Sequence, residues 1–283
     1  DRVKASVKEK SDDELLDHYQ LTQGQALTNL GVLCLGRQHH RAQLTTAPVI
    51  QFIKYDEHGQ KVNKLVWDDH TQSPMELIEA VWLEVPDFRE RYELPDGLYR
   101  QNVPAFDEIV VRELLVNALV HRPYTQRGDI FLNLHPDRLE MVNPGLLPLG
   151  VTPQNVLHTT VRRNGHMARL FHDLKLMERE GSGFDKIFEV LLSQGRPAPE
   201  LVETHDRVQV TVRRRILKPE VIDFIAKADQ TYQLTQRERI VLGLLAQHDA
   251  LTARELAGTL ELPSVEALPP WLKRLLDWNL VQS

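Results

Sequence analysis

One helix-length segment, residues 107–122, carries three polar side chains that could do chemistry together. Glu113, Asn117 and His121 recur at a spacing of four residues, which places them on one face of an α-helix. The rest of the segment is mostly apolar, so we expect the helix to be largely buried. A buried carboxylate and amide need partners, so a ligand, a metal ion or a water-filled cleft should face them. A narrow polar face that meets solvent is the alternative.

A glycine-containing turn and an arginine pair add candidate phosphate contacts. Gly181, Ser182 and Gly183 precede an apolar-periodic stretch that should form a helix, and N–H groups at a helix start can receive phosphate oxygens. Arg163, with its neighbour Arg162, could reach the same oxygens from the preceding loop. A plain turn and a solvated surface pair are the alternatives for these two features.

The elements that must position these residues are predicted as an α+β layer. Strands linked as hairpins are expected over residues 129–134 and 138–142, and over 201–204 and 207–215. Two further helices are expected over residues 164–177 and 184–192. Helices beside hairpin-linked strands favour a mostly antiparallel sheet.

The chain upstream of the central helix has its own helix starts and strands. Ser11 begins a capping box, and Ser73 precedes a first-turn proline and an acid, so each should begin a helix. Strands are expected over residues 48–55 and 61–67. Residues 86–104 are rich in proline and charge, and we interpret them as a connection between domains.

The last part of the chain, from residue 218 onward, is predicted as short helices in succession. They are expected over residues 235–246, 252–260 and 264–278, with residues 280–281 as the start of a wing strand. This outline is typical of a winged helix-turn-helix. Pro270 favours a late start for the last helix, whose candidate DNA contacts are Lys273 and Arg274. A dimerisation or packing role is the alternative, because this part is net acidic.

Composition limits the classes of protein that fit. The chain has 283 residues with a net charge of -6, so its surface as a whole is not a nucleic-acid-binding field. Cys34 is the only cysteine, which excludes an internal disulfide and favours a reducing compartment. We find no apolar run long enough to cross a membrane and no signal peptide. We therefore expect a cytoplasmic protein with no membrane partner, and a homo-oligomer is compatible with this expectation.

Four blocks in order resemble one bacterial and archaeal family. They are residues 112–122, residues 137–145 with the following Leu-Pro, the pair Arg163–Asn164, and Glu178 with residues 181–183. The first block resembles the N-box of the GHKL superfamily, and all four together resemble the RecG-related transcriptional regulators. That family joins a Schlafen AlbA-type domain, a GHKL-like domain and a C-terminal helix-turn-helix. The resemblance covers about residues 27–216, with residues 27–55 similar to the tail of an AlbA-type module.

The resemblance implies a fold, three domains and a ligand. The fold would be a GHKL (Bergerat-like) sandwich of helices on an antiparallel sheet, with a C-terminal winged helix. The domains would be residues 1–94, the tail of the AlbA-type module; 95–217, the ATP-binding domain; and 218–283, the winged helix. Glu113 would be the general base and Asn117 would hold Mg²⁺ beside ATP. The other nucleotide contacts would be His121, Asn143, Gly145, Arg163, Gly181, Ser182 and Gly183.

Two departures from the family pattern bear on this hypothesis. Asn143 stands where GHKL proteins read adenine with an aspartate, and Pro123 replaces an acid. An asparagine oxygen can still accept a hydrogen bond from an adenine amino group. We therefore expect a nucleotide-binding regulator that contacts DNA, with weak ATPase activity left open. A DNA- or protein-binding scaffold that does not hydrolyse ATP is the alternative. The sequence has no Gly-Lys pair and so no P-loop for a helicase motor.

Overall fold

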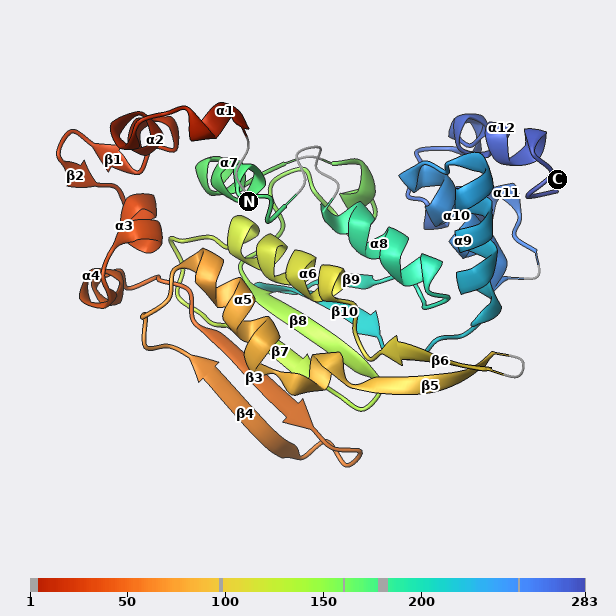
Figure 1. Cartoon of the computed structure of the whole chain (residues 1–283), viewed down its shortest axis with the longest axis horizontal. Helices are drawn as coiled ribbons and strands as arrows, with labels where there is room; N and C mark the ends of the chain where they lie inside the picture. The colour runs from red at the N-terminus through yellow and green to blue at the C-terminus, as the bar shows by residue number, and fades with distance from the viewer. Residues whose placement is uncertain (1–4, 97–98, 160, 178–182, 249, 283) are drawn as a thin grey trace.

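A six-stranded sheet organises the molecule. The computed structural model describes residues 5–96, 99–159, 161–177, 183–248 and 250–282. The sheet has the strand order β4-β3-β7-β8-β10-β9 (Figure 1). Its strands are β3 (Ile50–Tyr55), β4 (Lys61–Trp67), β7 (Ile130–Leu134), β8 (Arg138–Pro144), β9 (Glu200–Glu203) and β10 (Arg207–Arg213). Neighbouring strands are antiparallel except for β3 and β7, which run parallel. The predicted α+β fold with a mostly antiparallel sheet is confirmed.

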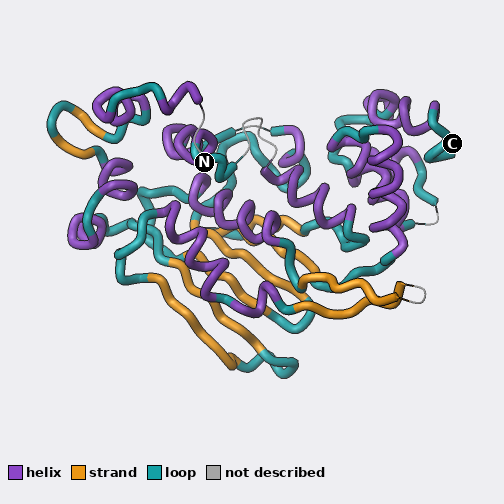
Figure 2. The backbone as a smooth tube through the Cα atoms, viewed as in Figure 1, coloured by secondary structure: helices purple, strands orange, loops and turns teal. Residues whose placement is uncertain are grey.

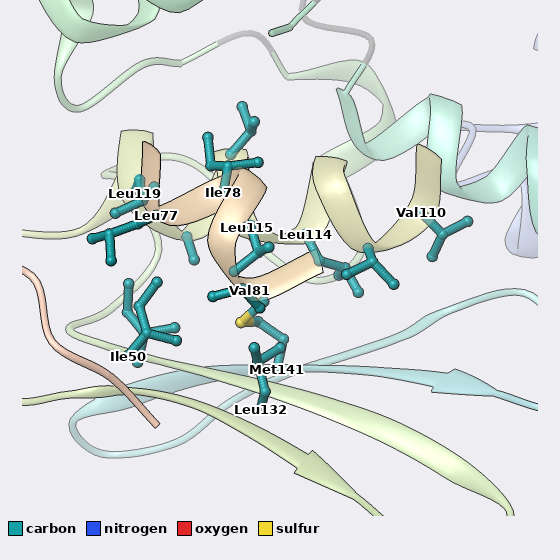
Figure 3. Packing of buried hydrophobic residues seen from close by; sticks show 14 of the residues in the cluster. Ile50, Leu77, Ile78, Val81, Val110, Leu114, Leu115, Leu119, Leu132 and Met141 are labelled. Carbon is teal, nitrogen blue, oxygen red and sulfur yellow. The ribbon is translucent and has the colours of Figure 1, made fainter. Parts of the chain in front are cut away.

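Helices cover one face of this sheet (Figures 1 and 2). They are α5 (Pro74–Glu84), α6 (Glu108–His121), α7 (Gly165–Asp173) and α8 (Gly183–Ser193). Figure 3 shows Leu114 and Leu115 of α6 directed toward Leu132 and Met141 of the sheet. These residues belong to one buried apolar core, and burying each large side chain contributes about 1.5 to 3 kcal/mol.

The central helix α6 forms where the sequence predicts it. The Asp107 carboxylate accepts a hydrogen bond from Ile109 N at 2.9 Å and caps the first turn. Apolar side chains surround the helix, and nine of its fourteen residues are buried. Pro123 follows the C-cap residue Arg122, and proline cannot continue the hydrogen-bonding pattern of a helix. The stripe of Glu113, Asn117 and His121 therefore lies on a rigid, deeply packed support.

The N-terminal region packs beside the sheet and then joins it. It contains α1 (Ala5–Lys8), α2 (Asp12–His18), β1 (Thr22–Gln23), β2 (Ala26–Leu27), α3 (Asn29–Leu35) and α4 (Gln38–Gln43). Both predicted helix starts, at Ser11 and Ser73, form capping boxes. β3 and β4 are strands of the main sheet, and α5 packs on α6.

Residues 86–104 are not the plain connection that their composition predicts. They form the 3-10 helix η1 (Pro86–Arg89) and a hairpin of β5 (Arg91–Asp96) and β6 (Tyr99–Pro104). The hairpin extends from the edge of the helical layer (Figure 1). Proline and charge conceal these strands in the sequence, because both residue types usually indicate loops.

The C-terminal part is a helical module whose apolar core also includes Phe188 and Leu192 of α8. Its elements are α9 (Glu220–Tyr232), α10 (Gln236–Gln247), α11 (Ala253–Thr259), η3 (Val265–Ala267) and α12 (Pro269–Asp277). The three predicted helices are present, α12 begins late as Pro270 suggested, and α9 was missed. The predicted wing strand at residues 280–281 is wrong. The chain turns back there instead, because Leu280 N donates to Leu275 O at 2.9 Å.

Within the described ranges, no helix has both the length and the apolar character needed to cross a membrane.

Candidate functional site

A cavity of about 130 Å³ opens between α6, α8 and the sheet. One wall is apolar and comes from several elements: Leu114, Met141, Met177, Phe184, Leu201, Val208 and Val210. The polar side chains that line it are Asn117 and His121 of α6, Asn143 of β8, and Thr159 and Arg162 of the connection before α7. An apolar cavity with a few convergent polar groups is the usual form of a small-molecule site.

Asn143 presents an unused hydrogen-bond acceptor at the cavity wall. Its amide nitrogen donates to Ala118 O in α6 at 3.1 Å. Because a carbonyl can only accept, this bond fixes which end of the amide is the nitrogen. Asn143 Oδ1 is buried and has no hydrogen-bond partner among the residues that the structure describes. A buried acceptor left unsatisfied costs about 1 to 3 kcal/mol. A ligand that donates a hydrogen bond to this oxygen would remove that cost.

Asn117 lies where α6 meets the first turn of α8. A Cβ atom added to Gly183 would be 3.1 Å from Asn117 Oδ1 and 3.1 Å from Glu113 Oε2. A side chain at position 183 would be a tight fit, and Asn117 and Glu113 would have to shift by a few tenths of an ångström to admit it. Asn117 Nδ2 is buried and lacks a hydrogen-bond partner within the described part of the chain. Asn117 and Gly183 both line the cavity, so they bring together two of the predicted site positions.

Glu113 lies deeper than the cavity. Its exposed fraction is 2%, and the residues that line the cavity include Asn117 and Gly183 but not Glu113. The carboxylate is next to the N-terminal end of α8, where the helix dipole stabilises negative charge. The polar stripe predicted on α6 is therefore present, but Asn117 lines the cavity and Glu113 does not.

His121 ends the stripe at the C-terminal end of α6. It lines the cavity, and its Nδ1 is buried with no hydrogen-bond partner in the described ranges. Burial, together with the positive charges of Arg163 and Arg162, lowers the pKa of His121 to about 4. The imidazole is therefore neutral at neutral pH and can donate or accept one hydrogen bond.

Arg163 attaches the connection between β8 and α7 to the C-terminal end of α6. Its guanidinium donates to His121 O at 3.2 Å and to Leu146 O at 2.8 Å. The next residue, Asn164, donates to Val120 O at 2.8 Å. The bonds to Val120 O and His121 O satisfy carbonyls that a helix C-terminus leaves without intrahelical partners. Of the arginine pair, Arg162 rather than Arg163 lines the cavity.

Gly145 forms a turn beside the cavity and does not line it. Its φ is +88°, and a Cβ there would be 2.4 Å from Pro123 Cγ. Glycine is therefore required both by the backbone conformation and by the contact with Pro123. The proline that departs from the family pattern packs directly on this turn. Gly181, Ser182 and Glu178 lie outside the described residues.

The two candidate DNA contacts lie on α12, away from the cavity. Both side chains are exposed. Arg274 is 3.2 Å from Glu238 Oε1 and its guanidinium stacks 4.4 Å from the centre of the Trp278 ring. Arg274 is therefore held by contacts within the helical module, and Lys273 is the more available cation.

Sequence reasoning missed the apolar wall of the cavity. Val208 and Val210 alternate along β10 and face the cavity together with Met141 of β8. The alternation predicts which face of the strand is buried, but not that this face leaves a space. Phe184 was recognised only as part of a helix.

The side chains present suit a magnesium–nucleotide better than a metal bound by protein alone. No group of three or more His, Cys, Asp or Glu side chains in the described part of the chain could hold a metal ion. Magnesium in nucleotide sites takes one or two protein oxygens, and phosphates and water complete its coordination. Asn117 lines the cavity and carries an amide oxygen of the kind that magnesium takes as a ligand.

Comparison with known proteins relates the sheet wall of this cavity to a described family. Residues 128–212 match the family model "Putative ATP-dependent DNA helicase recG C-terminal". The fold resembles a crystal structure of the DIP2311 protein from Corynebacterium diphtheriae, with a TM-score of 0.77, 23% identity and 96% of this chain covered. The match covers 57% of that protein, so this chain spans little more than half its length. Comparison with curated proteins gives no match. The segment from β7 to β10 is thus similar to a RecG-related, ATPase-like domain.

Proposed function

We propose that the cavity binds an adenine nucleotide, in the manner of a GHKL-like ATP-binding domain. The observation that carries this proposal is the unused acceptor Asn143 Oδ1, fixed in an otherwise apolar wall by the bond from its amide nitrogen to Ala118 O. The 6-amino group of adenine is a donor that would satisfy this oxygen. The match of residues 128–212 to an ATPase-like family model supports the same ligand class.

The apolar wall suits the flat face of a purine. Leu114, Met141 and Val210 border the space next to Asn143, and burial of a base against such side chains is favourable. Arg162 supplies positive charge to the same cavity. An apolar wall with one acceptor, together with a cation, suits the base and the phosphates of a nucleotide.

The polar side chains of the cavity would hold the phosphates. Asn117 would contribute an amide oxygen to a bound Mg²⁺, and Gly183 would bring the N-terminal turn of α8 toward the phosphate oxygens. When bound, Mg²⁺ would neutralise phosphate charge. His121, neutral at pH 7 because burial lowers its pKa to about 4, would add one hydrogen bond from its Nδ1 edge.

The first test compares ATP with GTP, because guanine carries an acceptor where adenine carries the amino group. We expect ATP with Mg²⁺ to raise the melting temperature of the protein more than GTP does. Asn143→Ala should weaken ATP binding about ten-fold or more, which is about 1.4 kcal/mol, and remove the preference. Asn133→Ala is the matched control, since Asn133 is a strand asparagine with an unpartnered buried Oδ1 outside the cavity. Equal stabilisation by ATP in both variants would refute the role of Asn143.

A second candidate is a nucleotide-responsive scaffold that does not hydrolyse ATP. The position of Glu113 favours it, because this carboxylate is 2% exposed and does not line the cavity. A general base must be within hydrogen-bond reach of the water it activates. We expect steady-state phosphate release at background level. Turnover above background that is lost in Glu113→Gln would instead support an ATPase.

The wider proposal is a nucleotide-binding regulator whose C-terminal module contacts DNA or a partner protein. The succession of α11, η3 and α12 supports it, since two short helices joined by a turn are the core of a helix-turn-helix. Lys273 is exposed on α12. The acidic balance of the module predicts weak DNA binding by the module alone. Filter binding at low salt, with Lys273→Ala as the comparison, tests it, and salt-independent binding would contradict DNA recognition.

A further inference from the structure

One edge of the cavity is formed by a segment that also contacts the C-terminal helices. This strap, defined as residues 150–159, includes the 3-10 helix η2 (Val156–His158). Val156 and Thr159 line the cavity, whereas Leu157 packs against the apolar core of the C-terminal module. Adjacent residues of one turn therefore face two different parts of the molecule.

Two hydrogen bonds attach the strap to the turn after α11. Leu157 N donates to Glu261 Oε2 at 3.0 Å, and His158 Nε2 lies 2.7 Å from Leu260 O. Because a carbonyl oxygen can only accept, His158 Nε2 carries the hydrogen in the second bond. The His158 ring also meets the ring of Trp271 edge-on, with centroids 6.0 Å apart. The strap is thus held by polar and aromatic contacts at the same place.

Hydrogen bonds within the strap hold its residues together as one unit. Asn155 Oδ1 accepts from Thr152 N at 2.7 Å, and Asn155 Nδ2 donates to Gly150 O at 2.9 Å. Thr159 Oγ1 donates to Asn155 O at 2.8 Å. A displacement at Leu157 or His158 is therefore carried to the residues that line the cavity.

Helix α8 makes a second connection between the same two parts. Phe184, in its first turn, lines the cavity and packs against both apolar cores. Farther along, Glu189 forms an ion pair with Arg239 of α10, with Nε and Oε1 2.6 Å apart. The module is thus anchored on α8, and it holds the strap through the turn after α11.

We propose that the C-terminal helical module controls occupancy of the cavity by holding the strap in place. The inference rests on the proposed function, since it assigns regulation to the proposed nucleotide site. We call the two hydrogen bonds from the strap to Glu261 and Leu260 the latch. While the latch is intact, Val156 and Thr159 continue to line the cavity. By thermodynamic linkage, a nucleotide that contacts them also stabilises the docked module. Anything that binds the module and withdraws the turn after α11 would release the nucleotide.

The test uses the whole chain and two latch variants. Glu261→Ala removes the acceptor for Leu157 N, and His158→Phe keeps an aromatic ring beside Trp271 but removes the donor to Leu260 O. Glu266→Ala is the matched control, because Glu266 is an exposed acid of the same module that forms a side-chain hydrogen bond with Ser264. Hydrogen exchange of residues 150–159 without nucleotide, and ATP affinity by titration calorimetry, are measured for each protein.

Both latch variants should exchange faster in the strap by about five-fold or more, and bind ATP more weakly by a similar factor. Glu266→Ala should behave as the wild type. Unchanged strap exchange in the latch variants would overturn the inference. If the wild type binds no ATP but the latch variants still exchange faster, the latch stands and the proposed nucleotide site fails. If Glu261→Ala does not fold, His158→Phe alone provides the same two outcomes.

Discussion

At the scale of single residues, the cavity is built from polar side chains that are partly used by the fold. Asn143 gives its amide nitrogen to Ala118 O and keeps its oxygen for a ligand. The Arg163 guanidinium donates hydrogen bonds to two backbone carbonyls. His121 keeps an unpartnered nitrogen within the described residues and is neutral. The fold thus orients each group before a ligand arrives, which lowers the entropic cost of binding.

The neutral state of His121 predicts a pH dependence of stability. Its pKa is lowered to about 4 in the folded protein, from 6.5 for an exposed histidine. The unfolded chain therefore binds a proton between pH 6.5 and 4 that the folded protein excludes, and stability falls as the pH falls through this window. From pH 7.5 to 5, the wild type should lose on the order of 1 to 2 kcal/mol more unfolding free energy than His121→Gln. Denaturant titrations at both pH values measure this difference. Equal losses of unfolding free energy in the wild type and in His121→Gln would show that His121 is exposed.

At the scale of elements, α8 connects the cavity to the C-terminal module. Its first residue, Gly183, packs on Asn117 and Glu113, and its later residue Leu192 packs on Gly243 of α10. Caps and periodicity predicted α6 and α8 closely, because those patterns are local. The β5–β6 hairpin and α9 were missed although both are local, because proline and charge concealed them. Contact between α8 and α10 could not be predicted, since it joins segments that are distant in sequence.

The close approach of α8 and α10 predicts the effect of one methyl group. A Cβ at Gly243 would lie 2.6 Å from Leu192 Cβ and 3.0 Å from the Leu192 carbonyl. Gly243→Ala should therefore destabilise the protein by about 1 to 3 kcal/mol. Gly258→Ala is the control, because a Cβ there meets nothing within 4 Å and alanine favours the helix. Thermal unfolding of the two variants compares them, and equal melting temperatures would show that the helices are not packed as described.

At the scale of the whole molecule, one sheet joins segments that lie far apart in the sequence. The parallel pairing of β3 with β7 links residues 50–54 to residues 130–134, and no local pattern predicts such a pairing. The stripe on α6 and the resemblance pointed to Asn117, His121 and Asn143, which line the cavity. The sequence could not show which of Glu113 and Asn117 reaches the cavity, because that depends on where α8 packs.

Titration calorimetry of this chain with ATP and Mg²⁺ tests the central claim most directly. A cavity with an unused acceptor and an apolar wall should bind one nucleotide per chain. The dissociation constant should be in the micromolar range, which corresponds to a binding free energy of about -8 kcal/mol. Asn143→Ala should reduce that affinity in the same titration. An absence of heat at high micromolar nucleotide, from protein shown to be folded, would contradict the assignment of the cavity as a nucleotide site.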